Sequence, residues 1–110
     1  MYDLEERTSV FGQRIIAFVK TLPNNTVTVP LIKQLVRSGT SIGANYCEAD
    51  GAASKADFRN KIALCRKEAK ETRYWLRLVC FTLPNYKNDA VSLTQEVHEL
   101  TLIFSAILKR

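Results

Sequence analysis

The longest amphipathic pattern in this sequence is FRNKIALCRKEAKETRYWLRLVCFTL, residues 58–83. Apolar or small residues recur in it at alternating steps of four and three, at Phe58, Ile62, Cys65, Ala69, Thr72, Leu76, Val79 and Leu83. Because an α-helix has 3.6 residues per turn, this spacing places all of these side chains on one face. Ser54 precedes the pattern as a candidate N-cap, and Pro84 follows it as a stop. The pattern therefore predicts one long helix over about residues 55–83.

Three shorter patterns with the same spacing flank this helix. They predict helices over about residues 3–22, 30–51 and 90–110. The first pattern ends at Pro23, the second begins with Pro30 as its first helical residue, and Ser92–Gln95 resembles a capping box for the last. Four helices with short connections favour an antiparallel up-down-up-down bundle. We therefore expect an all-α fold in a single domain over residues 1–110.

Composition narrows the class of protein. The chain has 110 residues, a formal net charge of +5, 46% hydrophobic residues and three cysteines. A core of this size leaves apolar surface exposed, which favours oligomers. An odd number of cysteines, with no signal-peptide pattern at the N-terminus, indicates the reducing cytoplasm. No run of about 18 apolar residues occurs, so we expect no membrane span.

The predicted long helix carries half of the sixteen basic residues. Six of them fall within about 40° of one line along the helix, beside the apolar face. This basic stripe consists of Lys55, Arg59, Arg66, Lys70, Arg73 and Arg77. Such a stripe is typical of a surface that contacts nucleic-acid phosphates. The equally weighted alternative is a solvated face whose long side-chain stems cover apolar edges.

The opposite flank of the same helix is acidic. Asp57, Glu68 and Glu71 gather there with Trp75. In a homo-oligomeric ring each subunit needs two different contact faces. The acidic flank and the basic stripe are complementary in charge, so the stripe could serve assembly in place of nucleic-acid binding.

The turn between the second and third predicted helices sets a register. If these helices are antiparallel neighbours, facing residues have numbers that sum to about 107. The expected ion pairs are Arg37 with Glu71 or Glu68, and Glu48 with Arg59 or Lys55.

The segment RSGTSIGANY, residues 37–46, places two glycines inside a helix. Gly39 and Gly43 are four residues apart and share one face. Each costs about 1 kcal/mol relative to alanine, so a compensating contact is expected. We expect these glycines to let the helix over residues 55–83 approach closely. Anion binding is the weaker alternative, because neither glycine is followed by the Lys and Ser/Thr of a phosphate loop.

No group of residues points to catalysis. His98 is the only histidine and has no second histidine or cysteine pair at metal-ligand spacing. Tyr74 and Trp75 could offer base stacking, although aromatic residues beside an apolar face more often belong to a core or an interface. We therefore expect a protein that is not an enzyme and holds no metal or cofactor.

Residues 37–76 carry a dense set of motifs. They are RSGTSIGANY at 37–46, Glu48-Ala49, Ala56-Asp57-Phe58, Lys61, Glu68 and ETRYWL at 71–76. This set resembles the bacterial four-helix bundle family known as 23S rRNA-intervening sequence proteins. The resemblance is looser elsewhere, where Asp3-Leu4 to Leu22-Pro23 is similar to the first helix of the family. Cys47 departs from the pattern, because the family often has a larger or charged residue there.

The resemblance implies a small cytoplasmic bundle, typically a homopentamer, without enzyme activity or cofactor. Nucleic-acid binding is the function usually suggested for the family. A related bundle is the accessory protein of the reverse transcriptase of diversity-generating retroelements. Two hypotheses follow: an oligomer whose basic stripe contacts RNA or DNA, and a protein scaffold that serves a nucleic-acid enzyme such as a reverse transcriptase.

Overall fold

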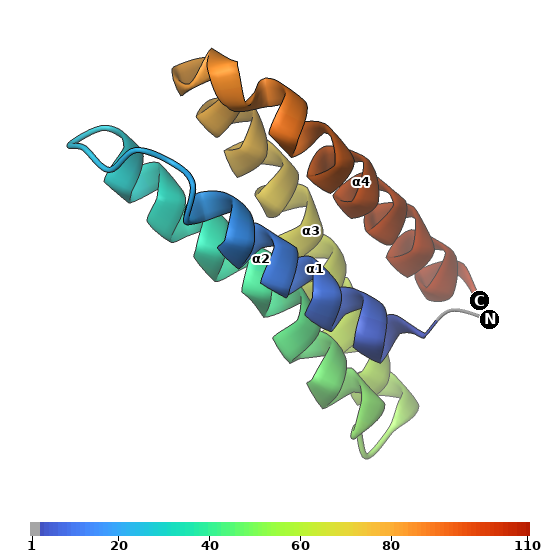
Figure 1. Ribbon diagram of the computed structural model, residues 1–110. Coiled ribbons are helices and arrows are strands. Elements are labelled where there is room, and N and C mark those ends of the chain that lie inside the picture. The colour runs from blue at the N-terminus through green and yellow to red at the C-terminus, as the bar shows by residue number, and fades with distance from the viewer. Residues whose placement is uncertain (1–2) are drawn as a thin grey trace.

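The computed structural model describes residues 3–110, and the regular structure in this range is entirely helical. The elements are α1 (Leu4–Val19), α2 (Thr28–Asp50), α3 (Lys55–Thr82), the short 3₁₀ helix η1 (Pro84–Tyr86) and α4 (Lys87–Lys109). The α-helices pack lengthwise into a body of 44 × 21 × 19 Å, and α1 begins at the end where α4 finishes (Figure 1). The all-α fold with four helices is thus confirmed for the described part of the chain. Residues 1 and 2, which the predicted domain also includes, lie outside it.

Side-chain caps begin two of the helices. The carboxylate of Asp3 accepts a hydrogen bond from the backbone N–H of Glu6 at the start of α1. The hydroxyl of Ser54 accepts one from the backbone N–H of Asp57 at 3.0 Å, and Ser54 has the extended backbone of an N-cap residue. The predicted cap of α3 is therefore confirmed.

The start of α2 differs from the prediction. The helix begins at Thr28, two residues before Pro30. The side-chain oxygen of Asn25 accepts hydrogen bonds from the backbone N–H groups of Val27 and Thr28. The hydroxyl of Thr28 in turn donates to the carbonyl oxygen of Pro23 at 2.7 Å. These hydrogen bonds stabilise the connection before α2, so the helix begins earlier than the position of Pro30 predicts.

Two other helix ends also differ. The regular part of α1 ends at Val19, before Leu22. The capping box predicted at Ser92 is wrong, because α4 begins at Lys87, directly after η1. Ser92 lies inside α4, where its hydroxyl accepts a hydrogen bond from the guanidinium of Arg14 on α1 at 2.8 Å.

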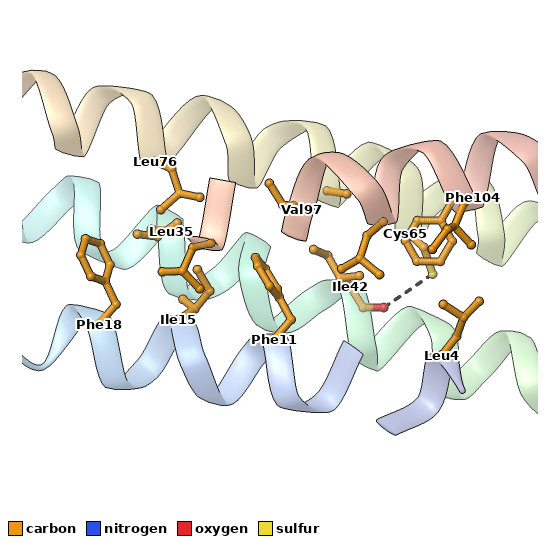
Figure 2. Close-up of a cluster of buried hydrophobic side chains, with 14 of the residues drawn as sticks. Leu4, Phe11, Ile15, Phe18, Leu35, Ile42, Cys65, Leu76, Val97 and Phe104 are labelled. Atoms are coloured by element: carbon orange, nitrogen blue, oxygen red, sulfur yellow. Dashed lines mark hydrogen bonds between the residues drawn. The ribbon is translucent and has the colours of Figure 1, made fainter. Parts of the chain in front are cut away.

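The core lies along the axis of the bundle. Of the predicted apolar face of α3, the six central residues are buried and the two at its ends are half-buried. Figure 2 shows Phe11, Ile42, Cys65 and Phe104 pointing toward one another from the four helices. The thiol of Cys65 donates to the carbonyl oxygen of Ile42 at 3.5 Å, and burial raises the pKa of Cys65 to about 12. Within residues 3–110, no helix has the length and apolar character needed to traverse a bilayer.

Candidate nucleic-acid interface

The acidic flank of α3 lies against α2. The guanidinium of Arg37 on α2 is 3.2 Å from a carboxylate oxygen of Glu68 and also pairs with Glu71. The indole N–H of Trp75 donates to Glu71 at 3.3 Å. The predicted partners of Arg37 are thus confirmed. These two carboxylates are engaged inside the chain, which leaves less of the acidic flank for a neighbouring subunit.

The predicted partners of Glu48 are wrong. Its carboxylate lies 3.0 Å from the ammonium nitrogen of Lys61, and this hydrogen bond raises the pKa of Lys61. Lys55 and Arg59 belong to the basic stripe, on the side of α3 that is turned away from α2. The guanidinium of Arg59 instead donates to the carbonyl oxygen of Leu108 near the end of α4, at 2.7 Å. The predicted register between α2 and α3 agrees with the Glu48–Lys61 pair, because these residue numbers sum to 109. The side of α3 expected to face Glu48, that of Lys55 and Arg59, is wrong.

The glycines of α2 face a different helix from the one expected. A Cβ atom added at Gly39 would lie 3.0 Å from Cγ1 of Ile15, and one added at Gly43 would lie 3.3 Å from Oγ1 of Thr8. Both Ile15 and Thr8 belong to α1 and are buried. The expectation that these glycines admit α3 is therefore wrong. They allow α1 to approach, because the glycine face of α2 is rotated toward that helix.

The basic stripe of α3 lies on the side of the helix next to α4. Five of its six residues are exposed, and Arg66 is half-buried. The guanidinium of Arg73 lies 3.1 Å from Nδ1 of His98 on α4. Among residues 3–110, no carboxylate forms an ion pair with any member of the stripe. The stripe therefore remains a surface of one sign.

Two hollows lie between α3 and α4, and both have basic linings. The larger, of about 730 Å³, is lined by residues near η1, such as Lys87, and is here called the upper groove. Its residues are Lys70, Arg73, Tyr74, Leu76, Arg77, Cys80, Phe81, Lys87, Val91, Thr94 and Gln95. The smaller, of about 420 Å³, is lined by Arg59, Asn60, Ala63, Arg66, Ser105, Leu108 and Lys109. Neither lining contains an acidic residue.

Sequence reasoning missed Lys87 and Lys109, which α4 contributes to these linings. Lys87 fell before the predicted start of the helix at residue 90. With α4 beginning at Lys87, a helical wheel would place Lys87, Val91, Ser105 and Lys109 on one side, about 40° or less apart. Together with the six residues of the stripe, these two lysines form what we call the basic face.

Two carboxylates of α4, those of Glu96 and Glu99, lie against Arg7 of α1. Arg7 forms two hydrogen bonds of 2.8 Å with the carboxylate of Glu96, and it lies 3.3 Å from Glu99. The hydrogen bond with Glu96 raises the pKa of Arg7 above its ordinary value. These ion pairs explain why the side of α4 next to α3 carries no compensating negative charge.

The chemistry that this site offers is binding of an anion over a broad surface. Cations, amide and hydroxyl groups and apolar side chains line the hollows. In the part of the chain that the structure describes, no three His, Cys, Asp or Glu side chains gather as metal ligands would. Cys80 lies in the upper groove, where burial raises its pKa and so lowers its nucleophilic character at neutral pH.

Comparison with known proteins connects this fold to a family. A family model described as 23S rRNA-intervening sequence protein matches residues 3–106. A crystal structure from Bacteroides thetaiotaomicron, described as a protein with unknown function from the S23 ribosomal protein family, is 35% identical. The match covers 97% of this chain and 99% of that one, with a TM-score of 0.85. No curated protein matches the chain.

Proposed function

The chain belongs to the 23S rRNA-intervening sequence protein family, and we propose that it is a non-enzymatic bundle that contacts RNA or DNA phosphates through the basic face. The observation that carries this proposal is the segregation of charge around α3 and α4. Glu68 and Glu71 are paired at α2, and Glu96 is paired at α1. The cations between α3 and α4 are left without a carboxylate partner among residues 3–110.

The dimensions of the basic face suit a nucleic acid. From Lys55 to Arg77 the stripe extends about 33 Å along α3, at 1.5 Å per residue. This length is close to one turn of a duplex, about 34 Å. Lysine and arginine that neutralise phosphates release condensed counterions, so affinity is expected to fall steeply as salt increases.

The test is a binding titration of the protein with a structured RNA at a low and a high salt concentration. We expect binding at low salt and a loss of affinity of several hundred-fold on a fourfold increase in salt, for about five phosphate contacts. Absence of binding at low salt, or binding that salt does not change, would contradict the proposal.

The proposal includes the finer architecture: an antiparallel up-down-up-down bundle that assembles into a homopentameric ring in the cytoplasm. The pairs Arg37–Glu68 and Glu48–Lys61 support the antiparallel order of α2 and α3, because the residue numbers rise in one helix as they fall in the other. The three cysteines are free thiols, as the cytoplasm favours. Light scattering of the purified protein would give the number of subunits directly.

A second candidate function is that of an accessory scaffold for a nucleic-acid enzyme, such as a reverse transcriptase. Large exposed apolar side chains favour it, since these mark contact surfaces: Leu102 on α4 is 56% exposed. Charge reversal in the pair of variants Arg66→Glu and Lys70→Glu separates the two candidates. Loss of RNA binding by an intact oligomer supports the nucleic-acid function, whereas loss of assembly supports the scaffold.

A further inference from the structure

Four exposed residues near the end of α3 form a row of alternating chemistry. Lys70, Tyr74, Arg77 and Phe81 follow one another at steps of four, three and four, so they lie along one line of the helix surface. Tyr74 is 50% exposed and Phe81 is 85% exposed. Rings this exposed are accessible to a ligand. The row thus alternates cation and ring along the rim of the upper groove.

The upper groove beside this row is both apolar and basic. Cys80 and Val91 supply apolar surface, and Lys87 adds a cation from the start of α4. Its volume of about 730 Å³ falls in the range of small-ligand sites. A purely apolar partner would leave the cations unpaired, and a compact inorganic anion would leave the rings and the apolar surface unused.

We propose that the upper groove binds unpaired nucleotides of a single-stranded nucleic acid. The bases stack on Tyr74 and Phe81, and Lys70, Arg77 and Lys87 hold the phosphates on either side. This inference rests on the proposed function and specifies which form of nucleic acid this end of the basic face takes.

The spacing of the rings agrees with this mode of binding. Tyr74 and Phe81 are seven residues apart, which is about 10 Å along the helix axis. In a single strand the bases are free to splay onto aromatic rings, whereas in a duplex the faces of paired bases are already stacked on their neighbours. Stacking tolerates any base, so the site is expected to prefer single strands without a strong sequence preference.

The orientation of Tyr74 supports the assignment. Its ring lies edge-to-face against Trp75, with centroids 5.1 Å apart. Trp75 is half-buried and its indole N–H is bonded to Glu71, which restricts its ring. Trp75 therefore gives the Tyr74 ring a fixed neighbour, while half of the Tyr74 side chain stays exposed. Of the two ordinary roles expected for an aromatic residue beside an apolar face, core or interface, the exposure of Tyr74 leaves the interface.

The experiment compares two probes with the full chain by fluorescence anisotropy at low salt. One probe is a labelled oligouridylate of about 12 nucleotides, and the other is an RNA duplex of the same length. The variant Phe81→Ala removes the more exposed ring. Leu102→Ala removes another exposed apolar side chain, which lies on α4 outside both hollows. Circular dichroism and light scattering on each variant report folding and the number of subunits.

We expect Phe81→Ala to weaken oligouridylate binding about tenfold, as the loss of one stacked base does, and to leave duplex binding unchanged. Leu102→Ala should change neither. Equal weakening of both probes, or of neither, would overturn the inference. A change in subunit number on Phe81→Ala would also overturn it, because the groove would then hold a second copy of the chain. Binding of the duplex alone defeats this inference and leaves the proposed function standing, whereas binding of neither probe defeats the proposed function itself.

Discussion

The α1–α2 interface and the α3–α4 interface of this bundle are built in opposite ways. Between α1 and α2, Gly39 and Gly43 remove side chains so that Ile15 and Thr8 pack directly on the backbone of the neighbouring helix. Between α3 and α4, long basic side chains line two hollows of about 730 and 420 Å³. At Gly39 and Gly43 the first interface has little room for an added methyl group, and the second has room for a ligand.

This difference separates two uses of the same helical architecture. Close packing gains dispersion contacts and excludes water, so the α1–α2 interface contributes to stability. The cations of the basic face do not stabilise one another within a single chain, since like charges repel. We infer that the α3–α4 interface is kept open for binding, and variants on each side can test that division.

The largest contrast is expected in thiol reactivity. Cys65 is fully buried at the centre of the bundle, Cys80 lines the upper groove and Cys47 is exposed. With its pKa raised to about 12, only about one Cys65 thiol in ten thousand is a thiolate at pH 8. We expect a disulfide reagent to modify Cys47 and Cys80 in the native protein and Cys65 about a thousandfold more slowly. Peptide mapping by mass spectrometry over time measures the three rates. Equal rates at Cys65 and Cys80 would show that the upper groove is no more open than the core of the bundle.

The next effect concerns the closest helix contact. In Gly43→Leu, a bulky side chain must displace Thr8 and the backbone of α1, so we expect the free energy of unfolding to fall by about 3 kcal/mol. The matched comparison is Arg37→Ala on the same helix. The side chain of Arg37 is 46% exposed, so its ion pairs should contribute about 1 kcal/mol or less to the free energy of unfolding. Thermal unfolding at equal protein concentration measures both. If Gly43→Leu melts like the parent, the account of close packing is wrong.

Two alanine substitutions at glycines between α1 and α2 are expected to change the free energy of unfolding by smaller amounts and in opposite directions. A Cβ added at Gly12 would meet Thr40 at an ordinary 3.8 Å, so Gly12→Ala should stabilise the protein by about 0.5–1 kcal/mol through helix propensity. A Cβ added at Gly39 would lie 3.0 and 3.1 Å from two carbons of Ile15, which is fully buried. Gly39→Ala should therefore be destabilising, by about 1 kcal/mol net. Denaturant unfolding of the two variants gives the signs. Equal stabilisation by both would mean that Gly39 is not a close contact.

The parts that sequence reasoning obtained correctly depend on local periodicity and on register. The apolar face of α3 follows from steps of four and three, and the Ser54 cap follows from its position one residue before the helix. The pairing of Arg37 with Glu68 and Glu71 follows from counting across the turn between α2 and α3. None of these inferences requires knowing how each helix is rotated about its own axis.

The parts that were wrong or missed depend on that rotation. The expected neighbour of Gly39 and Gly43 is α3, but they lie against α1. Glu48 pairs with Lys61, on the side of α3 that faces α2. Sequence periodicity shows which residues share a face of a helix. It does not show which of two neighbouring helices packs against that face, and only the packed bundle shows this.

Lys87 illustrates a second source of error, the boundary of an element. The sequence pattern predicts the last helix from about residue 90, whereas α4 begins at Lys87, directly after η1, and so brings Lys87 to the upper groove. A tertiary contact also replaced the expected cap, since Ser92 bonds to Arg14 on α1. At this end of α4, the preceding η1 and the contact with α1 therefore determine the structure, and neither is visible in the local sequence pattern.

The most direct test of the central claim, that the open α3–α4 interface is the binding surface, is the salt dependence of RNA affinity. The double variant Lys70→Gln/Arg77→Gln removes two charges from the basic face, and Lys20→Gln/Lys33→Gln removes two exposed charges from the ends of α1 and α2. Each phosphate contact contributes about 0.9 to the slope of log affinity against log salt. We predict that the slope becomes shallower by about 2 in the first variant and stays unchanged in the second. The same slope in both variants would contradict the account.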